Sequence, residues 1–123
     1  MQFEPDAPTL LAAIARLLDE QVLIAVSPEL QHQVRVAGHL AHLVERELRL
    51  GPGSAAAERQ LLAELLGGDD SDRRLADLVA ALAERIRTAD DVELERRVWP
   101  ALVAVTRADL AIAKPGHDAW EGE

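Results

Sequence analysis

The chain has 123 residues, a length that suits one domain with one hydrophobic core. Hydrophobic residues make up 49% of it, which is enough apolar material to fold and argues against intrinsic disorder. Thirteen Lys and Arg face 22 Asp and Glu, and the resulting net charge of -9 repels nucleic-acid phosphates, so we expect no nucleic-acid binding. The absence of cysteine excludes disulfides and thiolate chemistry and fits a reducing compartment.

No segment predicts export or membrane insertion. Residues 1–6 carry acidic side chains where a secretory signal needs positive charge. The longest strongly apolar runs, 22–26 and 101–105, are far shorter than the ~20 residues of a membrane-spanning helix. We therefore expect a cytoplasmic protein that does not enter the membrane.

Helical periodicity in five segments, with no two-residue alternation, predicts an all-α fold. We expect a compact bundle of about five helices that forms a single domain over residues 1–123. The first helix should begin near residues 6–9, where Asp6 can cap it and Pro8 fits its first turn. Ser27 followed by Pro28 predicts a break and the start of the next helix.

The second helix is expected to run to Leu50 and to end at Gly51 and Pro52, because a Gly past the last turn and a Pro after it stop helices. Its apolar arc is the widest in the chain, which predicts a central position in the bundle. The arc consists of Leu30, Val34, Val36, Ala37, Leu40, Ala41, Leu43, Val44 and Leu48.

Three further helices are expected. Ser54 can cap the third, which should end at residues 67–68, and the acidic run 69–72 suits the start of the fourth. Asp90 and Asp91 suit the start of the fifth. Pro100 predicts a kink or a division in this helix, and Pro115 its end. Residues 116–123 lack periodicity and are expected to form a loose tail, with Trp120 able to pin it.

Positive side chains recur every three or four residues along the second helix, so they should share one edge of it. We call this set the basic edge; it consists of His32, Arg35, His39, His42, Arg46 and Arg49. The histidine spacing could bring two or three imidazoles to a metal ion. We expect no metal site, because Arg35 and Arg46 would repel a cation and no carboxylate on the edge completes a ligand set.

Two interpretations of the basic edge stay open. In the first, Arg46 and Arg49 pair with carboxylates of neighbouring helices, as exposed charges usually do. In the second, the edge binds an anionic partner, because the planar Arg guanidinium suits carboxylates and phosphates.

Two carboxylates, Glu47 and Asp109, fall on or beside an apolar arc and are candidate buried polar residues. A structural ion pair with Arg35 or Arg46, or a position at the rim of the bundle, explains them best, and an acid or base in a pocket is the alternative. On this basis Glu47→Ala should destabilise the fold. The sequence shows no nucleophile motif and no phosphate-binding loop, which does not favour an enzyme.

The segment HQVRVAGHLAHLVERELRLG, residues 32–51, resembles the signature of a family of small all-helical bacterial domains of unknown function. The resemblance extends through PTLLAAIARLLDEQV, ADLVAALAERIRTAD and LAIAKP, which occupy residues 8–22, 76–90 and 110–115. Members occur alone, or near or fused to aminoglycoside-phosphotransferase-like kinases and acyl-CoA dehydrogenases. The resemblance therefore implies an accessory role beside such an enzyme, and it brings no known activity with it.

Two positions depart from the family pattern. His39 stands where an Asn is expected, and Lys114, Pro115, Gly116 and His117 replace an ending similar to Asn-Pro-Arg-Tyr. These departures weaken any inference that the C-terminal tail forms part of a functional site.

These observations favour a non-catalytic interaction domain, without a cofactor, that binds a kinase-like or acyl-CoA enzyme or a second copy of itself through the basic edge. The alternative is a small-molecule domain in which the basic edge and the inward carboxylates line a pocket for acyl-CoA or a nucleotide phosphate. An enzyme that uses Glu47 or a histidine as general base lacks a second catalytic group.

Overall fold

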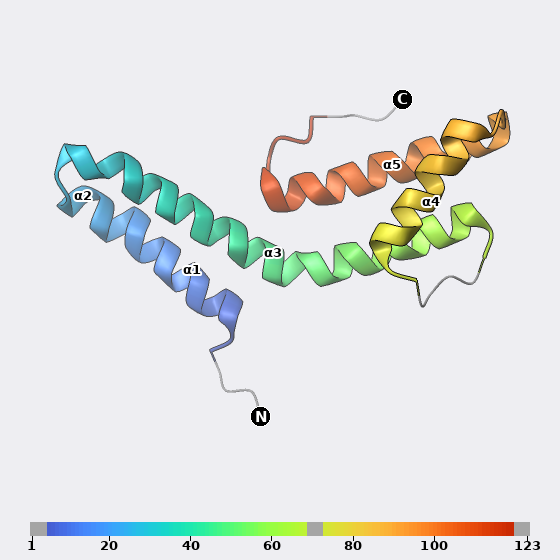
Figure 1. The fold of residues 1–123 in the computed structure, drawn as a ribbon. Coiled ribbons are helices and arrows are strands. Elements are labelled where there is room, and N and C mark those ends of the chain that lie inside the picture. The colour runs from blue at the N-terminus through green and yellow to red at the C-terminus, as the bar shows by residue number, and fades with distance from the viewer. Residues whose placement is uncertain (1–4, 69–72, 120–123) are drawn as a thin grey trace. The chain divides into compact units, whose positions relative to one another are not determined.

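A computed structural model describes residues 5–68 and 73–119, and these residues form four helices and no strand (Figure 1). The first is a continuous run of α1 (Ala7–Leu17), a π-helical segment η1 (Leu18–Val22) and α2 (Leu23–Ala25). The others are α3 (Pro28–Leu66), α4 (Leu75–Thr88) and α5 (Val92–Ala113). The all-α prediction is confirmed, with four helices in place of about five.

The chain divides into two units, Met1–Pro52 and Gly53–Glu123. The first unit, called the N-terminal hairpin below, pairs the run from α1 to α2 with the first half of α3 (Figure 1). The second unit contains the rest of α3 together with α4 and α5. Whether the chain behaves as a single domain stays a prediction.

Several predicted helix ends are confirmed by their capping geometry. The Asp6 carboxylate accepts a hydrogen bond from the Thr9 backbone at 3.0 Å, and the hydrogen bonds from Thr9 lower the pKa of Asp6. The Asp91 carboxylate accepts from the Leu94 backbone at 3.1 Å. Gly67 adopts a left-handed φ of 74° just past the end of α3, where a residue without a Cβ suffers no strain.

The predicted helix end at Gly51 and Pro52 is wrong, because α3 continues through both residues to Leu66. Pro52 removes the backbone donor for the Leu48 carbonyl, but its fixed φ is compatible with a helix, and the Ala-rich and Leu-rich residues that follow favour helix strongly. Ser54 is therefore inside α3 and caps no helix. Pro100 does not divide α5, which is continuous from Val92 to Ala113.

The hydrophobic core cluster lies in the second unit, where Leu78 is fully buried. The cluster consists of Leu62, Leu65, Leu78, Leu82, Leu94, Val98 and Ala101. It contains no residue of 28–50, and the central position predicted for this stretch stays a prediction. Most large apolar side chains of that stretch are about half exposed.

Two predictions concern the loop before α4 and the C-terminal tail. The acidic run 69–72 and Trp120 lie outside the described residues. The tail was expected to be loose, but the Asp118 carboxylate accepts a hydrogen bond from Arg107 Nε at 2.6 Å, which ties the described part of the tail to α5.

Candidate functional site

The basic edge lies on a single uninterrupted helix, because α3 covers the whole of residues 30–50. His32, Arg35, His39 and Arg49 are exposed, whereas His42 and Arg46 are half-buried. The six side chains therefore follow one helix, but they differ in what they contact.

His42 is held by the opposite helix of the N-terminal hairpin. Its Nε2 donates to the Asp19 carboxylate at 2.9 Å. Asp19 belongs to the π-helical segment, where the Leu23 backbone N–H donates to the Leu18 carbonyl five residues earlier. Such a widened turn changes the direction in which side chains leave the helix.

The close approach at this point depends on Gly38, which is buried. A Cβ on Gly38 would collide with the Asp19 carboxylate. The missing side chain thus makes room for Asp19 to reach across to His42.

A second member of the edge, Arg49, is paired within its own helix. Its Nη1 lies 2.8 Å from Glu45 Oε1, and Glu45 is the buried carboxylate of the hairpin, with only 7% of its surface exposed. Glu47 is exposed, so the prediction that it is a buried polar residue is wrong. Arg46 also has an interaction partner within the chain.

The remaining members of the edge are His32, Arg35 and His39. They are exposed, and they make no hydrogen bond or ion pair with the described part of the chain. Pairing within the chain therefore occupies His42 and Arg49, although the partner of Arg49 lies on its own helix and not on a neighbouring helix as the first interpretation predicts. His32, Arg35 and His39 stay available to an anionic group.

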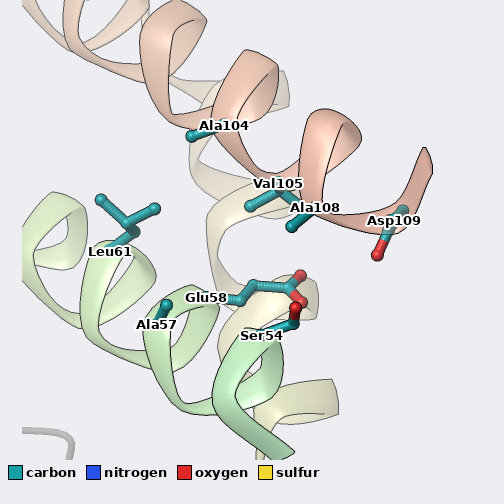
Figure 2. Close-up of a pocket in the computed structure, with 8 residues that line it drawn as sticks. All are labelled: Ser54, Ala57, Glu58, Leu61, Ala104, Val105, Ala108 and Asp109. Carbon is teal, nitrogen blue, oxygen red and sulfur yellow. The ribbon is translucent and has the colours of Figure 1, made fainter. Parts of the chain in front are cut away.

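A separate polar site lies in the second unit, in a cavity of about 80 Å³ between α3 and α5 (Figure 2). Its lining residues are Ser54, Ala57, Glu58, Leu61, Ala104, Val105, Ala108 and Asp109. In Figure 2, Glu58 extends from α3 toward α5, and Asp109 projects from α5 at the same end of the cavity. The space holds a few water molecules and is far smaller than the ~300–1,000 Å³ of a small-molecule site.

Burial raises the pKa of Glu58, and the negative charge of Asp109 raises it further. Asp109 itself is exposed, so its predicted burial is wrong. Glu58 was missed by sequence reasoning, although a signal was present: Glu58 precedes Leu61 and Leu65 at helical spacing and therefore lies on the inward side of α3.

Two wider hollows adjoin α5. One, of about 290 Å³, is lined mainly by apolar side chains that include Trp99, Leu102 and Leu110. The other, of about 450 Å³, lies beside Arg97, which donates to the Glu64 carbonyl at 3.2 Å. Neither of these hollows contains a residue of the basic edge.

No three His, Asp or Glu side chains gather into a metal-binding group within residues 5–68 and 73–119. None of the helices described is long and apolar enough to cross a membrane.

Comparison with known protein families identifies the family of the chain, and the match covers most of the helices described above. A family model for a domain of unknown function, DUF6285, matches residues 24–117. The chain belongs to this family. The DUF6285 match covers α3, α4 and α5 and begins after α1. Neither the curated proteins nor the solved structures contain a match to the chain.

Proposed function

We propose that this DUF6285 chain is a non-catalytic accessory domain that binds an acidic surface of a partner protein through the free part of the basic edge. The observation that carries the proposal is the group formed by His32, Arg35 and His39, which are exposed on one helix and without a partner in the described chain. The charge of Arg35 can steer an acidic partner, and the imidazoles of His32 and His39 can donate hydrogen bonds to its carboxylates.

Contacts within the hairpin order this surface in the absence of a partner. His42 bonds to Asp19 of the opposite helix, and buried Gly38 lies against the same Asp19, so the turn of α3 that carries His39 is held against that helix. A surface that is ordered in advance loses less conformational entropy on binding.

The class of partner in this proposal is a kinase-like or acyl-CoA enzyme, as the resemblance implies. An accessory role for such an enzyme in the cytoplasm is part of the proposal. The small-molecule alternative requires a concave site at the basic edge. The three cavities described above are lined by residues between Ser54 and Asp118, which gives that alternative no support.

Co-purification from the native cell extract tests the proposal. The tagged chain should retain a second protein, and the double variant Arg35→Glu/His39→Glu should reduce its recovery at least tenfold, because reversed charges repel an acidic surface. Binding by the unmodified chain should also weaken as salt is added.

Arg96→Glu/His117→Glu serves as the control, because it makes the same two replacements at exposed positions outside the basic edge. The control should retain the partner. Equal recovery with the charge-reversed variant and with the unmodified chain would contradict the proposal.

A further inference from the structure

The helix α3 runs from one unit of the chain into the other. The boundary between the two units falls between Pro52 and Gly53, inside this helix. The units are therefore joined by a helix and not by a loop, and the properties of α3 at the boundary decide how rigid the connection is.

Each half of α3 is fixed within its own unit. In the hairpin, the His42 imidazole bonds to the Asp19 carboxylate at 2.9 Å, which ties the first half of α3 to the preceding helix. In the second unit, Leu62 and Leu65 belong to the hydrophobic core cluster. These contacts hold α3 on both sides of the boundary but do not reach the residues between them.

The stretch of α3 between these contacts is open to solvent. Among residues 47–53, six of the seven are exposed, and Gly51 is half-buried. Seven residues make almost two turns of an α-helix, so this stretch is exposed around its whole circumference. Its helical form therefore depends on its backbone hydrogen bonds, without the tertiary packing that stabilises most protein helices.

The backbone hydrogen bonds of α3 are weakest at the unit boundary. The sequence there is Gly51-Pro52-Gly53, and Gly and Pro have the lowest helix propensities of all residues. Pro52 has no N–H to donate to the Leu48 carbonyl, and its ring crowds that carbonyl. A Cβ on Gly53 would meet nothing within 4 Å, so this side of the helix faces open space. Sharp bends in helices occur at such residues.

We propose that residues 51–53 are a hinge in α3, about which the N-terminal hairpin and the second unit change their relative orientation while each keeps its own fold. The absent hydrogen bond and the two glycines let the helix bend at the boundary. The contacts on either side keep the two halves of α3 in their units. Because the basic edge ends at Arg49, the whole edge moves with the hairpin.

The distance between one label in each unit measures the hinge. The chain has no cysteine, so Gln33→Cys and Glu95→Cys, both at exposed positions, carry two spin labels on the full chain. Double electron–electron resonance should give a broad distribution of distances between them. Adding Pro52→Ala/Gly53→Ala should narrow this distribution about twofold, because it restores the hydrogen bond to the Leu48 carbonyl and favours helix.

A pair of labels within the hairpin is the matched control. Ala13→Cys and Gln33→Cys are exposed positions on α1 and α3 of the same unit. Their distance distribution should be narrow, and Pro52→Ala/Gly53→Ala should leave it unchanged. The control separates motion of the units from motion of the labels.

Hydrogen exchange of the unlabelled chain is an independent measurement. In a continuous helix the amides of residues 53–56 donate to carbonyls at or before the boundary, so bending exposes them to exchange. They should exchange about tenfold faster than the amides of residues 62–65, and Pro52→Ala/Gly53→Ala should slow them.

Both measurements use the chain alone, so their outcome does not depend on the proposed partner. A narrow distribution between the units of the unmodified chain, or a width that Pro52→Ala/Gly53→Ala does not change, would overturn the hinge. Equal exchange of the two sets of amides would overturn it as well.

Discussion

Two carboxylates that lie two residues apart on α3, Glu45 and Glu47, have opposite surroundings. Glu45 is buried and paired with Arg49 at 2.8 Å, while Glu47 is exposed. Glu45→Ala should lower the free energy of unfolding by about 1–3 kcal/mol, because it removes packing and a charge-assisted bond at a buried site. Glu47→Ala should change it by less than about 0.5 kcal/mol. Urea denaturation of both variants measures the difference, and equal losses would contradict the assignment.

The sequence predicts that Glu47 is the buried carboxylate, whereas the structure shows that Glu45 is. The apolar arc of α3 is so wide that the sequence does not reveal which part of it faces α1. The contact side is fixed by Gly38, whose missing side chain admits Asp19. That side includes Glu45 and excludes Glu47, and the pattern of one helix alone does not contain this information.

Glu58 gives the protein a pH-dependent contribution to stability. Its raised pKa means that the folded chain binds a proton more tightly than the unfolded chain does. The contribution is therefore favourable below the ordinary pKa of 4.5 and is lost as the pH rises through the raised value. Glu58→Gln should be more stable than the unmodified chain at pH 7, by about 0.2–1 kcal/mol, the magnitude usual for partly exposed charge pairs.

This advantage of Glu58→Gln should disappear on acidification below the ordinary glutamate pKa, because the carboxyl of the unmodified chain is then protonated in both states. Thermal melts at several pH values measure it. Glu95→Gln, an exposed position on α5, is the matched control. An advantage that persists unchanged in acid would show that charge is not its cause.

At the scale of the element, α3 is continuous across Gly51, Pro52 and Gly53, where the sequence predicts an end. An internal Pro weakens a helix by about 3 kcal/mol or more and each Gly by about 1 kcal/mol, and in α3 the helix formers on both sides outweigh this cost. The starts of α1 and α5 were predicted correctly because Asp6 and Asp91 act on the backbone three residues ahead, which is a local effect. Whether a helix continues through an internal Pro depends on the helix propensity of all its residues and not on the local sequence alone.

Two glycines of α3 should respond differently to the same substitution. A Cβ on Gly53 meets nothing within 4 Å, so Gly53→Ala should stabilise the chain by about 0.5–1 kcal/mol through its better helix propensity. Gly38→Ala should not gain this amount, because its Cβ pushes Asp19 away and breaks the bond to His42. Thermal melts of the two variants compare them directly. A larger gain at Gly38 than at Gly53 would contradict the described packing.

At the scale of the whole molecule, the core of the second unit follows the helical repeat of the sequence. Its buried residues recur at intervals of three or four along each helix, as in Leu62 and Leu65, Leu78 and Leu82, and Leu94, Val98 and Ala101. The hairpin was harder to predict, because its apolar side chains outnumber those that it can bury between two helices. The pattern of one helix does not show which of these apolar side chains face the neighbouring helix.

The central claim is that this DUF6285 chain works by holding a different protein on the basic edge of α3. Native mass spectrometry of the chain isolated gently from its own cells tests this claim most directly. The account predicts a complex that contains a second, acidic polypeptide and that is lost with Arg35→Glu/His39→Glu. A chain found alone at 13.4 kDa, or only with further copies of itself, would contradict it.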